Sequence, residues 1–267
     1  MSEPTTTEVW ARLRALARQE GEPVSVRHAC VVCALVLDAR GAGLSMTRDG
    51  GVCEPVFATD EHSRAMDELQ FTVGEGPNLD AVAWGSPVLV ADLLDPAVAV
   101  RWPVFTPAAA RLGARSVIAM PVRSAAAEFG VLTCYRDRPG LPGAAAVSAA
   151  FVCADAVLVL ALDGRGGVSP SLTDLLDTGF AAHGARVHQA AGMVSVQLGV
   201  DITDALVRLR AHAFARDRPL SEVAAEVLSR RLRFAGDGTG GPPDAWCFPV
   251  PRAGNVPREP NEEGGDR

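Results

Sequence analysis

The sequence predicts an α+β domain followed by a small all-α module. Over roughly the first 160 residues, short helical patterns alternate with strand–turn–strand pairs, which is typical of an α+β fold. Near the end, three helical stripes follow one another with short loops between them, which indicates a helical bundle. A chain of 267 residues with 48% hydrophobic residues is long enough for two domains and can bury a core.

The first elements of the α+β domain are indicated by local patterns. Val9, Leu13 and Leu16 recur at the spacing of one helix face, and Asp60 has the side chain of a helix N-cap. The turn DGG separates two runs that read as a hairpin. The expected elements are helices over 8–19 and 26–37, strands over 41–48 and 52–59, the turn 49–51, and a helix over 61–69.

The later elements are separated by residues that break regular structure. FTVGEGP (71–77) places two glycines and a proline in one turn, and PGLPG (139–143) precedes a long apolar helix. The expected elements are a short helix over 79–84, strands over 87–93, 114–123 and 127–137, a turn and helix over 101–113, and a helix over 144–162.

These patterns divide the chain into five segments. We expect an N-terminal helix (1–23), the α+β domain (24–163), a linker (164–171), the three-helix module (172–234) and a tail (235–267). The tail is rich in Gly, Pro and acidic residues, a composition typical of a disordered segment.

Each helix of the module has one apolar stripe. Gly199 is expected to end the first helix, and Asp201 is expected to cap the second. The stripes are Val187, Ala190, Val194 and Leu198, then Ala205, Leu206, Leu209 and Ala213, and finally Leu220, Val223, Ala224, Val227 and Leu228. Short loops would bring the three stripes together around one core.

Positive charge is concentrated on this module. The whole chain has a net charge of −7, whereas residues 186–234 hold 8 arginines and 5 acidic residues and are therefore basic. The arginines outside the apolar stripes include Arg208, Arg210, Arg216 and Arg218. Guanidinium groups bind phosphate in a bidentate manner and stack on bases. A solvated helix face with ion pairs is the alternative interpretation.

The order of residues in the module resembles one family. HQAAGM (188–193), LGV (198–200), AL (205–206), LR (209–210), Leu220 and VA (223–224) follow one another as in ANTAR transcription antitermination domains. The resemblance implies a domain that binds paired stem-loops of nascent RNA, usually as a dimer, and so prevents a terminator from forming. Unstacked bases of RNA loops can stack on Arg side chains.

The RNA-binding candidates are Gln189, Gly192, Arg208, Arg210, Arg216 and Arg218. Gly192 has a second interpretation, because a glycine also allows close packing between helices. The chain departs from the family at Ala191, where many members have Lys, and at Asp217 and Pro219, where they have Asn and a basic residue. Each departure removes a favourable RNA contact.

The α+β domain has a resemblance of its own. FTVGEGP, SPVLVADL, RWPVF, ARSVIAMPVR and AEFGVLTCYRDRPG follow one another as in the GAF domains that precede ANTAR modules in actinobacterial regulators. The resemblance implies a sensory domain with a central antiparallel sheet, helices on its faces and often a ligand. A family likeness does not name the ligand. Sequence signatures for cyclic-nucleotide, bilin or haem binding are not apparent, so the cofactor stays unknown.

Two groups of residues are candidates for the sensor. Cys30 and Cys33 form C-x-x-C on one helix face, which fits a redox pair, half of a metal site, or two buried core residues. No second C-x-x-C or His pair accompanies them, so we expect no metal site, and their apolar neighbours favour the core. A thiol sensor is the functional alternative.

The second group surrounds the FTVGEGP turn. Gly74 and Gly76 are expected to take positive φ angles in a tight turn at the rim of the ligand cavity. Glu75 would repel a phosphate, and the segment lacks the lysine of a P-loop. Arg101 and Trp102 either close the same site or begin a helix.

The sequence therefore predicts a signal-responsive antitermination regulator that is not an enzyme, with RNA and a small molecule as partners and a homodimeric state. The chain lacks a long uncharged apolar run and a signal-peptide pattern, so we expect a cytoplasmic protein without a membrane partner. Two alternatives stay open. One is a thiol-dependent GAF enzyme such as a methionine sulfoxide reductase, and the other is a dimerising interaction module that does not bind RNA.

Overall fold

The structure is a computed structural model, which describes residues 6–48, 52–124, 128–162 and 181–235. The predicted linker, the start of the predicted module (172–180) and the tail beyond residue 235 lie outside the described residues. Their boundaries therefore stay predictions.

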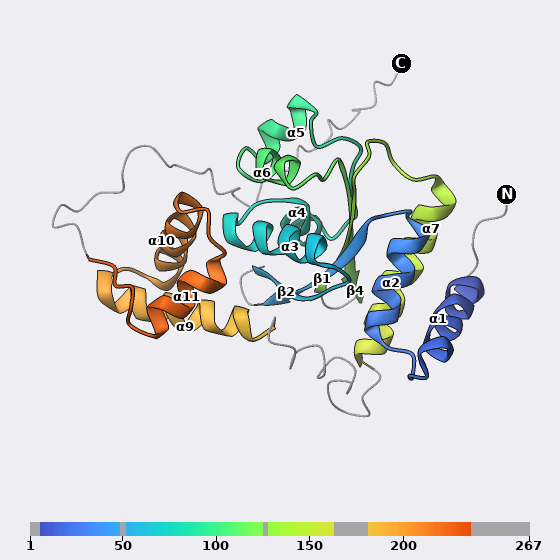
Figure 1. Ribbon diagram of the computed structural model, residues 1–267, viewed down its shortest axis with the longest axis horizontal. Coiled ribbons are helices and arrows are strands. Elements are labelled where there is room, and N and C mark those ends of the chain that lie inside the picture. The colour runs from blue at the N-terminus through green and yellow to red at the C-terminus, as the bar shows by residue number, and fades with distance from the viewer. Residues whose placement is uncertain (1–5, 49–51, 125–127, 163–180, 236–267) are drawn as a thin grey trace, which may run out of the picture. The chain divides into compact units, whose positions relative to one another are not determined.

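A five-stranded antiparallel sheet forms the centre of the first domain (Figure 1). Its strands are β1 (Gly41–Arg48), β2 (Val52–Ala58), β3 (Val88–Val90), β4 (Ser116–Arg123) and β5 (Glu128–Arg136). They lie in the order β2-β1-β5-β4-β3, so β1 and β5 join the two hairpins expected from the sequence. The predicted α+β fold with an antiparallel sheet is confirmed.

Both faces of this sheet are buried. In β4, Ile118 and Met120 belong to one apolar cluster, while Val117 and Ala119 belong to a second cluster on the opposite face. Successive side chains of a strand point to opposite faces, so a strand covered on both sides has no face exposed to water. This explains why β4 and β5 read as nearly continuous apolar runs.

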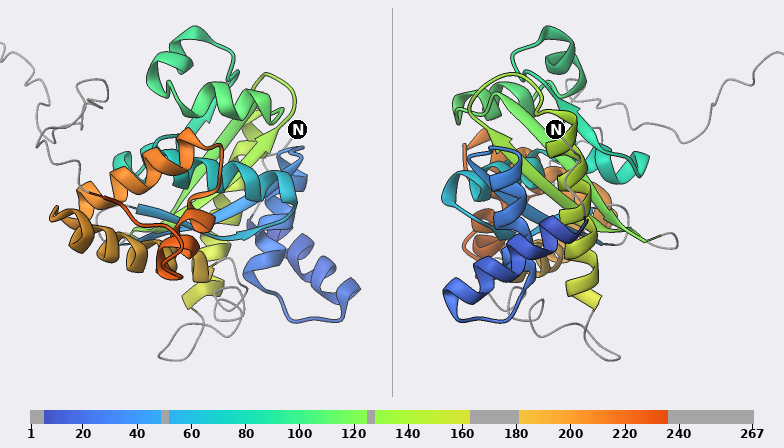
Figure 2. Two further views of the ribbon diagram at one scale, coloured as in Figure 1. Left: turned by 60° about the vertical axis from the view of Figure 1, so that its left-hand side comes forward. Right: turned by 90° about the vertical axis from the view of Figure 1, so that its right-hand side faces the viewer.

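Three helices cover one face of the sheet (Figure 2). They are α1 (Thr6–Glu20), α2 (Val26–Val36) and α7 (Ala144–Leu162). α2 and α7 pack together and against the sheet, and α1 adds Val9 and Leu13 to the same cluster. Among the described residues, α7 is the one helix long and apolar enough to cross a membrane. It buries one side, including Ala150 and Cys153, in this cluster, as a core helix does.

Four helices lie on the other face. They are α3 (Glu61–Val73), α4 (Pro77–Trp84), α5 (Pro96–Arg101) and α6 (Phe105–Arg111). α3 starts as predicted at Asp60, whose side chain accepts a hydrogen bond of 2.7 Å from the Ser63 amide. It ends at Gly74, which adopts the left-handed conformation with φ +73°. α3 contacts β1 and β2 of the sheet and also helices nearer the C-terminus of the chain.

Three details of the prediction were wrong. Residues 71–73 are the last turn of α3 and not part of a turn segment, because the helix stops only at the first left-handed glycine. β3 is shorter than the predicted strand 87–93. α5 was not expected, although Asp95 caps it through the Ala97 amide and Pro96 occupies its first turn.

The three helices of the module are α9 (Ala181–Leu198), α10 (Ile202–Ala215) and α11 (Leu220–Leu228). Gly199 has φ +65° after α9, and the Asp201 side chain accepts a 2.9 Å hydrogen bond from the Asp204 amide at the start of α10. Both helix boundaries agree with the predicted signals. α9, α10 and α11 enclose one apolar cluster that includes the predicted stripes.

Candidate functional site

A polar network is buried between α3, α4 and the sheet. It lies on the α3 side because β1 presents glycines and a serine there. A Cβ atom at Gly43 would lie 1.8 Å from Oδ2 of Asp67, and one at Gly41 would lie 2.4 Å from Oγ of Ser63. Only glycine lets the polar face of α3 approach the strand this closely. The sequence GAG at the start of β1 therefore positions Asp67 against the sheet.

The network joins six side chains from four elements. Its members are Ser45 of β1, Asp67 and Gln70 of α3, Asn78 of α4, and Thr133 and Tyr135 of β5. All six are buried. Asp67 accepts hydrogen bonds from the Tyr135 hydroxyl and, at 3.3 Å, from Nδ2 of Asn78. Asn78 in turn accepts a bond of 2.6 Å from the Thr133 hydroxyl and donates one of 3.4 Å to Ser45.

Gln70 links the network to the next turn. Its Nε2 donates to the Tyr135 hydroxyl at 2.8 Å, and its Oε1 accepts from the Asn78 amide at 2.8 Å. A Cβ at Gly76 would lie 2.5 Å from Oε1 of Gln70, and Gly76 has φ +135°. Gly76 is therefore needed both for its backbone conformation and for this contact, and the predicted positive φ angles at Gly74 and Gly76 are confirmed.

Asp67 is the one member of the network with an unsatisfied buried oxygen among the described residues. Its Oδ2 is buried and has no hydrogen-bond partner among the described residues. Burial raises the pKa of Asp67 to about 7, although the hydrogen bonds from Tyr135 and Asn78 lower it. Burial and the neighbouring Asp67 together raise the pKa of Tyr135 well above its ordinary value. The pKa of Asp67 therefore lies near neutral pH.

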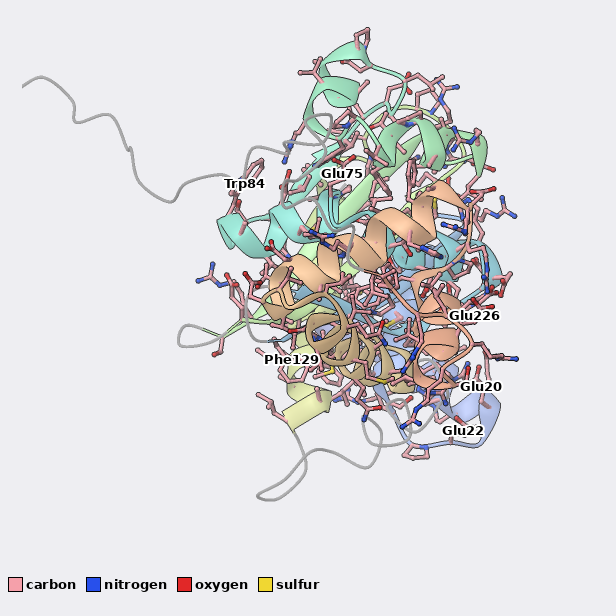
Figure 3. All side chains as sticks on the ribbon, turned by 90° about the vertical axis from the view of Figure 1, so that its left-hand side faces the viewer. Glu20, Glu22, Glu75, Trp84, Phe129 and Glu226 are labelled. Carbon is pink, nitrogen blue, oxygen red and sulfur yellow. The ribbon has the colours of Figure 1, made fainter. Side chains whose placement is uncertain are left out.

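Glu75 has a structural role that the sequence did not suggest. Its Oε1 accepts hydrogen bonds of 2.6 Å from the amides of both Val104 and Phe105, at the start of α6. A carboxylate at this position satisfies two amides that have no partner within the helix. Glu75 thus fixes the turn after α3 to the connection between α5 and α6, and Figure 3 labels it.

Arg101 and Trp102 do not belong to the polar network. Arg101 pairs with Asp80 at 2.6 Å, and its guanidinium lies over the rings of Trp84 and Trp102, with centroids 4.2 and 4.4 Å away. Trp102 is buried and donates a bond of 3.0 Å to Asp80, whereas Trp84 is exposed at the end of α4 (Figure 3). Arg101 is the last residue of α5. The Trp102 carbonyl accepts a hydrogen bond of 3.0 Å from the Thr106 amide in the first turn of α6, so this segment leads into a helix, as one of the two interpretations has it.

The cysteines of the C-x-x-C motif are core residues, as the sequence favoured. Cys30 and Cys33 are fully buried in the cluster on the α2 face of the sheet, and Cys134 donates from its Sγ to the Sγ of Cys33 at 3.6 Å. Burial raises the thiol pKa of Cys30 far above its ordinary value. The pKa of Cys33 is also raised, first through the hydrogen bond with Cys134. These thiols are not poised to form thiolates.

One cluster of side chains among the described residues has the spacing of a metal site. Ligand atoms of Glu20, Glu22 and His28 lie within 4.8 Å of one another, and Figure 3 labels Glu20 at the end of α1 and Glu22 just beyond it. His28 Nδ1 accepts from the Ser25 amide at 3.0 Å, so its proton lies on Nε2 and faces Glu20. Arg27 pairs with Glu20. The Arg27 guanidinium and the proton on Nε2 of His28 therefore already neutralise or bond the carboxylates of this cluster.

The structure separates the predicted RNA-binding residues into two groups. Gln189, Arg208 and Arg216 are exposed, while Arg218 is held by Glu222 and Glu226 at 3.3 and 3.1 Å. The ion pairs of Arg218 correspond to the alternative interpretation of this surface. A Cβ at Gly192 would meet no atom within 4 Å, so the close-packing interpretation of Gly192 was wrong. Ala191 is buried in the core of the module.

Arg210 differs from the other arginines of the module. We expected it outside the buried surface, but it lies against Gly74 of the GAF-like domain, where a Cβ would be 2.9 Å from its Nη1. Its Nε is buried and has no hydrogen-bond partner among the described residues. Burial lowers the pKa of Arg210 to about 10, so the group stays charged at neutral pH. The expectation failed because α10 contacts α3, which sequence spacing does not show.

Two further contacts join the module to the first domain. Phe71 of α3 is buried in the apolar cluster of α9, α10 and α11. Glu54 of β2 lies 2.8 Å from Nε2 of His188, and a Cβ at Gly184 of α9 would lie 2.3 Å from Oε2 of the same carboxylate. His188 thus faces the first domain.

Sequence reasoning missed the whole polar network. Its members come from positions as far apart as Ser45 and Tyr135, so no local motif contains them. Two signals were present: glycines at alternate positions of β1, and the polar residues Asp67 and Gln70 on one face of α3. Together they indicate a helix that approaches a strand through polar side chains.

Comparisons with known proteins bear on the first domain. A family model for the GAF domain matches residues 24–157, close to the predicted 24–163. The chain is similar to a domain of a two-component sensor histidine kinase protein from Sinorhizobium meliloti, at 18% identity and a TM-score of 0.38, covering 49% of this chain and 83% of that one. It is also similar to the GAF domain of a phosphoenolpyruvate-protein phosphotransferase from Coxiella burnetii, at 15% identity and a TM-score of 0.42, covering 58% and 94%.

A third similar structure is a type II free methionine-R-sulfoxide reductase from Thermoplasma acidophilum, at 17% identity and a TM-score of 0.39, covering 55% of this chain and 94% of that one. No curated protein matches the chain significantly. The assignment rests on the family model, which covers half of the chain. The chain belongs to the GAF domain family, whose members are small-molecule sensing modules of signalling proteins.

Proposed function

We propose that this chain is a signal-responsive transcription antitermination regulator, in which α9, α10 and α11 bind stem-loop RNA under the control of the GAF domain. The observation that carries this proposal is the burial pattern of the module. The predicted apolar stripes lie in one cluster, and this arrangement leaves Gln189, Arg208 and Arg216 at the surface. Exposed arginines on a basic helical module suit phosphates and unstacked bases.

The polar network is the proposed centre of signal detection. It combines a buried carboxylate, whose Oδ2 has no partner in the part of the chain that the structure describes, with an amide, a phenol and a hydroxyl around it. A small molecule or a proton that binds Oδ2 of Asp67 would change the hydrogen bonds that Asp67 makes with Tyr135 and Asn78. Its effect would reach α3 first, because Asp67 and Gln70 both belong to that helix.

The thiol-enzyme alternative receives less support. A catalytic cysteine needs an accessible thiolate, and basic neighbours lower its pKa. Cys30, Cys33 and Cys153 are buried, and the pKa of each is raised above the ordinary thiol value. Burial also raises the pKa of Cys53 to about 12. We propose that these thiols stabilise the fold.

The test is a salt-titrated gel shift of the full chain with an RNA that carries two stem-loops. The Arg208→Ala/Arg216→Ala variant should bind roughly tenfold or more weakly than the wild type, because it loses two phosphate contacts. The matched control is Arg111→Ala, which removes an exposed arginine from α6. Binding that is equal in all three proteins, or absent at low salt, would favour the interaction module that does not bind RNA.

A further inference from the structure

The N-terminus of α11 lacks a cap from its own segment. Pro219 occupies the N-cap position and provides no side-chain hydrogen bond. The first amides of a helix have no acceptor within the helix, so buried ones need a partner from elsewhere. Leu220 is fully buried, so water does not serve it.

α3 of the GAF domain provides the missing acceptors. Oγ1 of Thr72 accepts a hydrogen bond of 3.2 Å from the Leu220 amide. Oε1 of Glu68 accepts from the amide and the hydroxyl of Ser221, at 3.4 and 2.8 Å. A carboxylate at a helix N-terminus is also favoured by the helix dipole. The sensory domain thus caps a helix of the module.

The same face of α3 carries Phe71, which is buried in the module core. Phe71 and Thr72 lie three and four positions after Glu68, so both are on the same side of the helix as Glu68. Asp67 and Gln70 also lie three positions apart and face the polar network. α3 therefore contacts the proposed signal centre with one face and the module with another.

Arg210 connects this contact with RNA binding. It is one of the residues that the ANTAR resemblance places on the RNA surface, yet it packs against Gly74 at the end of α3. Arg210 as a whole is half-buried, but its Nε is buried and its Nη1 faces Gly74. An RNA phosphate therefore cannot reach Nε while the module stays in this position.

We propose that the GAF domain holds the module in an autoinhibited state, in which α3 caps α11 and withholds Arg210 from RNA. This inference rests on the proposed function. A signal that moves α3 at Asp67 or Gln70 weakens the bonds from Glu68 and Thr72. The module then leaves α3, and Arg210 becomes available for a phosphate.

The experiment compares the full-length wild type with Glu68→Ala/Thr72→Val. Two quantities are measured: hydrogen exchange of the Leu220 and Ser221 amides, and affinity for the double stem-loop RNA. Loss of several hydrogen bonds should speed exchange by roughly tenfold or more and raise RNA affinity by a similar factor. The control Glu61→Ala removes the same charge from the exposed start of α3, and should change neither quantity by as much.

Two further variants keep the test decisive if the double variant does not fold. Ser221→Ala leaves α3 intact and removes one bond, so it should raise both quantities roughly two- to fivefold. Glu68→Gln keeps an acceptor for Ser221 and should behave nearly as the wild type does.

The inference is overturned if exchange at Leu220 and Ser221 stays unchanged, or if the proteins bind RNA and exchange accelerates while RNA affinity does not rise. A different result separates the two proposals. If no protein binds RNA but exchange accelerates, the antitermination function fails and with it the withholding of Arg210, whereas the capping of α11 by α3 stands.

Discussion

At the scale of single residues, Asp67 shows how burial creates a pH response. Its pKa in the folded protein is raised to about 7, whereas an aspartate in an unfolded chain titrates at about 3.9. The folded state therefore holds the proton more tightly than the unfolded state does. Its contribution to stability is complete below about pH 4 and is lost as the pH rises through about 7.

This argument predicts how Asp67→Asn behaves. The variant lacks the titrating group but keeps an oxygen that accepts from Tyr135. Between about pH 4 and 7, the free energy of unfolding of the wild type should fall relative to that of the variant, by at most about 1.4 kcal/mol per pH unit. Urea unfolding of both proteins across this range measures the difference. Parallel pH profiles would show that Asp67 has an ordinary pKa.

At the scale of elements, many boundaries could be predicted because their signals are local. Asp60 and Asp201 cap the helices that their side chains suggested, and Gly199 ends α9 with a positive φ angle. Residues 71–73 were predicted as part of a turn, but they form the last helical turn of α3. The cause is local here as well, since Phe71 and Thr72 extend the helix until Gly74 stops it. Boundaries that depend on one side chain and its neighbours are readable from a sequence.

Contacts between elements could not be predicted in the same way. The cap of α11 comes from Glu68 and Thr72 of α3. Glu68 lies 153 positions before Ser221, and Thr72 lies 148 positions before Leu220. Arg210 was expected at the surface because its own helix leaves it outside the apolar stripe. The neighbouring α3 changes its environment. Both the polar network and the cap of α11 are formed by contacts of this kind, between residues far apart in the sequence.

The missing local cap of α11 leads to a prediction at this scale. Pro219→Ser provides a hydroxyl that can accept from the amides of the first turn, so α11 should depend less on α3. A serine N-cap contributes about 1 kcal/mol to helix stability. The Glu68→Ala change should therefore lower the free energy of unfolding by less in the Pro219→Ser background than in the wild type. Equal losses in the two backgrounds, measured by urea unfolding, would contradict a shared capping role.

At the scale of the whole molecule, the GAF domain contributes side chains to the core of the module and to the cap of one of its helices. Phe71 belongs to the sensory domain in sequence and to the module in packing. Glu54 contributes a second contact through His188, on another element of the module. A domain that both completes the core of its neighbour and caps one of its helices can control that neighbour through small movements of one helix, α3.

The salt dependence of RNA binding then distinguishes the docked module from the released one. Each phosphate contact with a single-stranded loop adds about 0.7 to the slope of log affinity against log salt concentration. Release in Glu68→Ala/Thr72→Val makes Arg210 available, so its slope should be steeper than that of the wild type by about this amount. Adding Arg210→Ala to the released protein should return the slope to the wild-type value. A released protein that binds RNA more tightly without a steeper slope would mean that Arg210 contacts no phosphate, and that α3 withholds another part of the module.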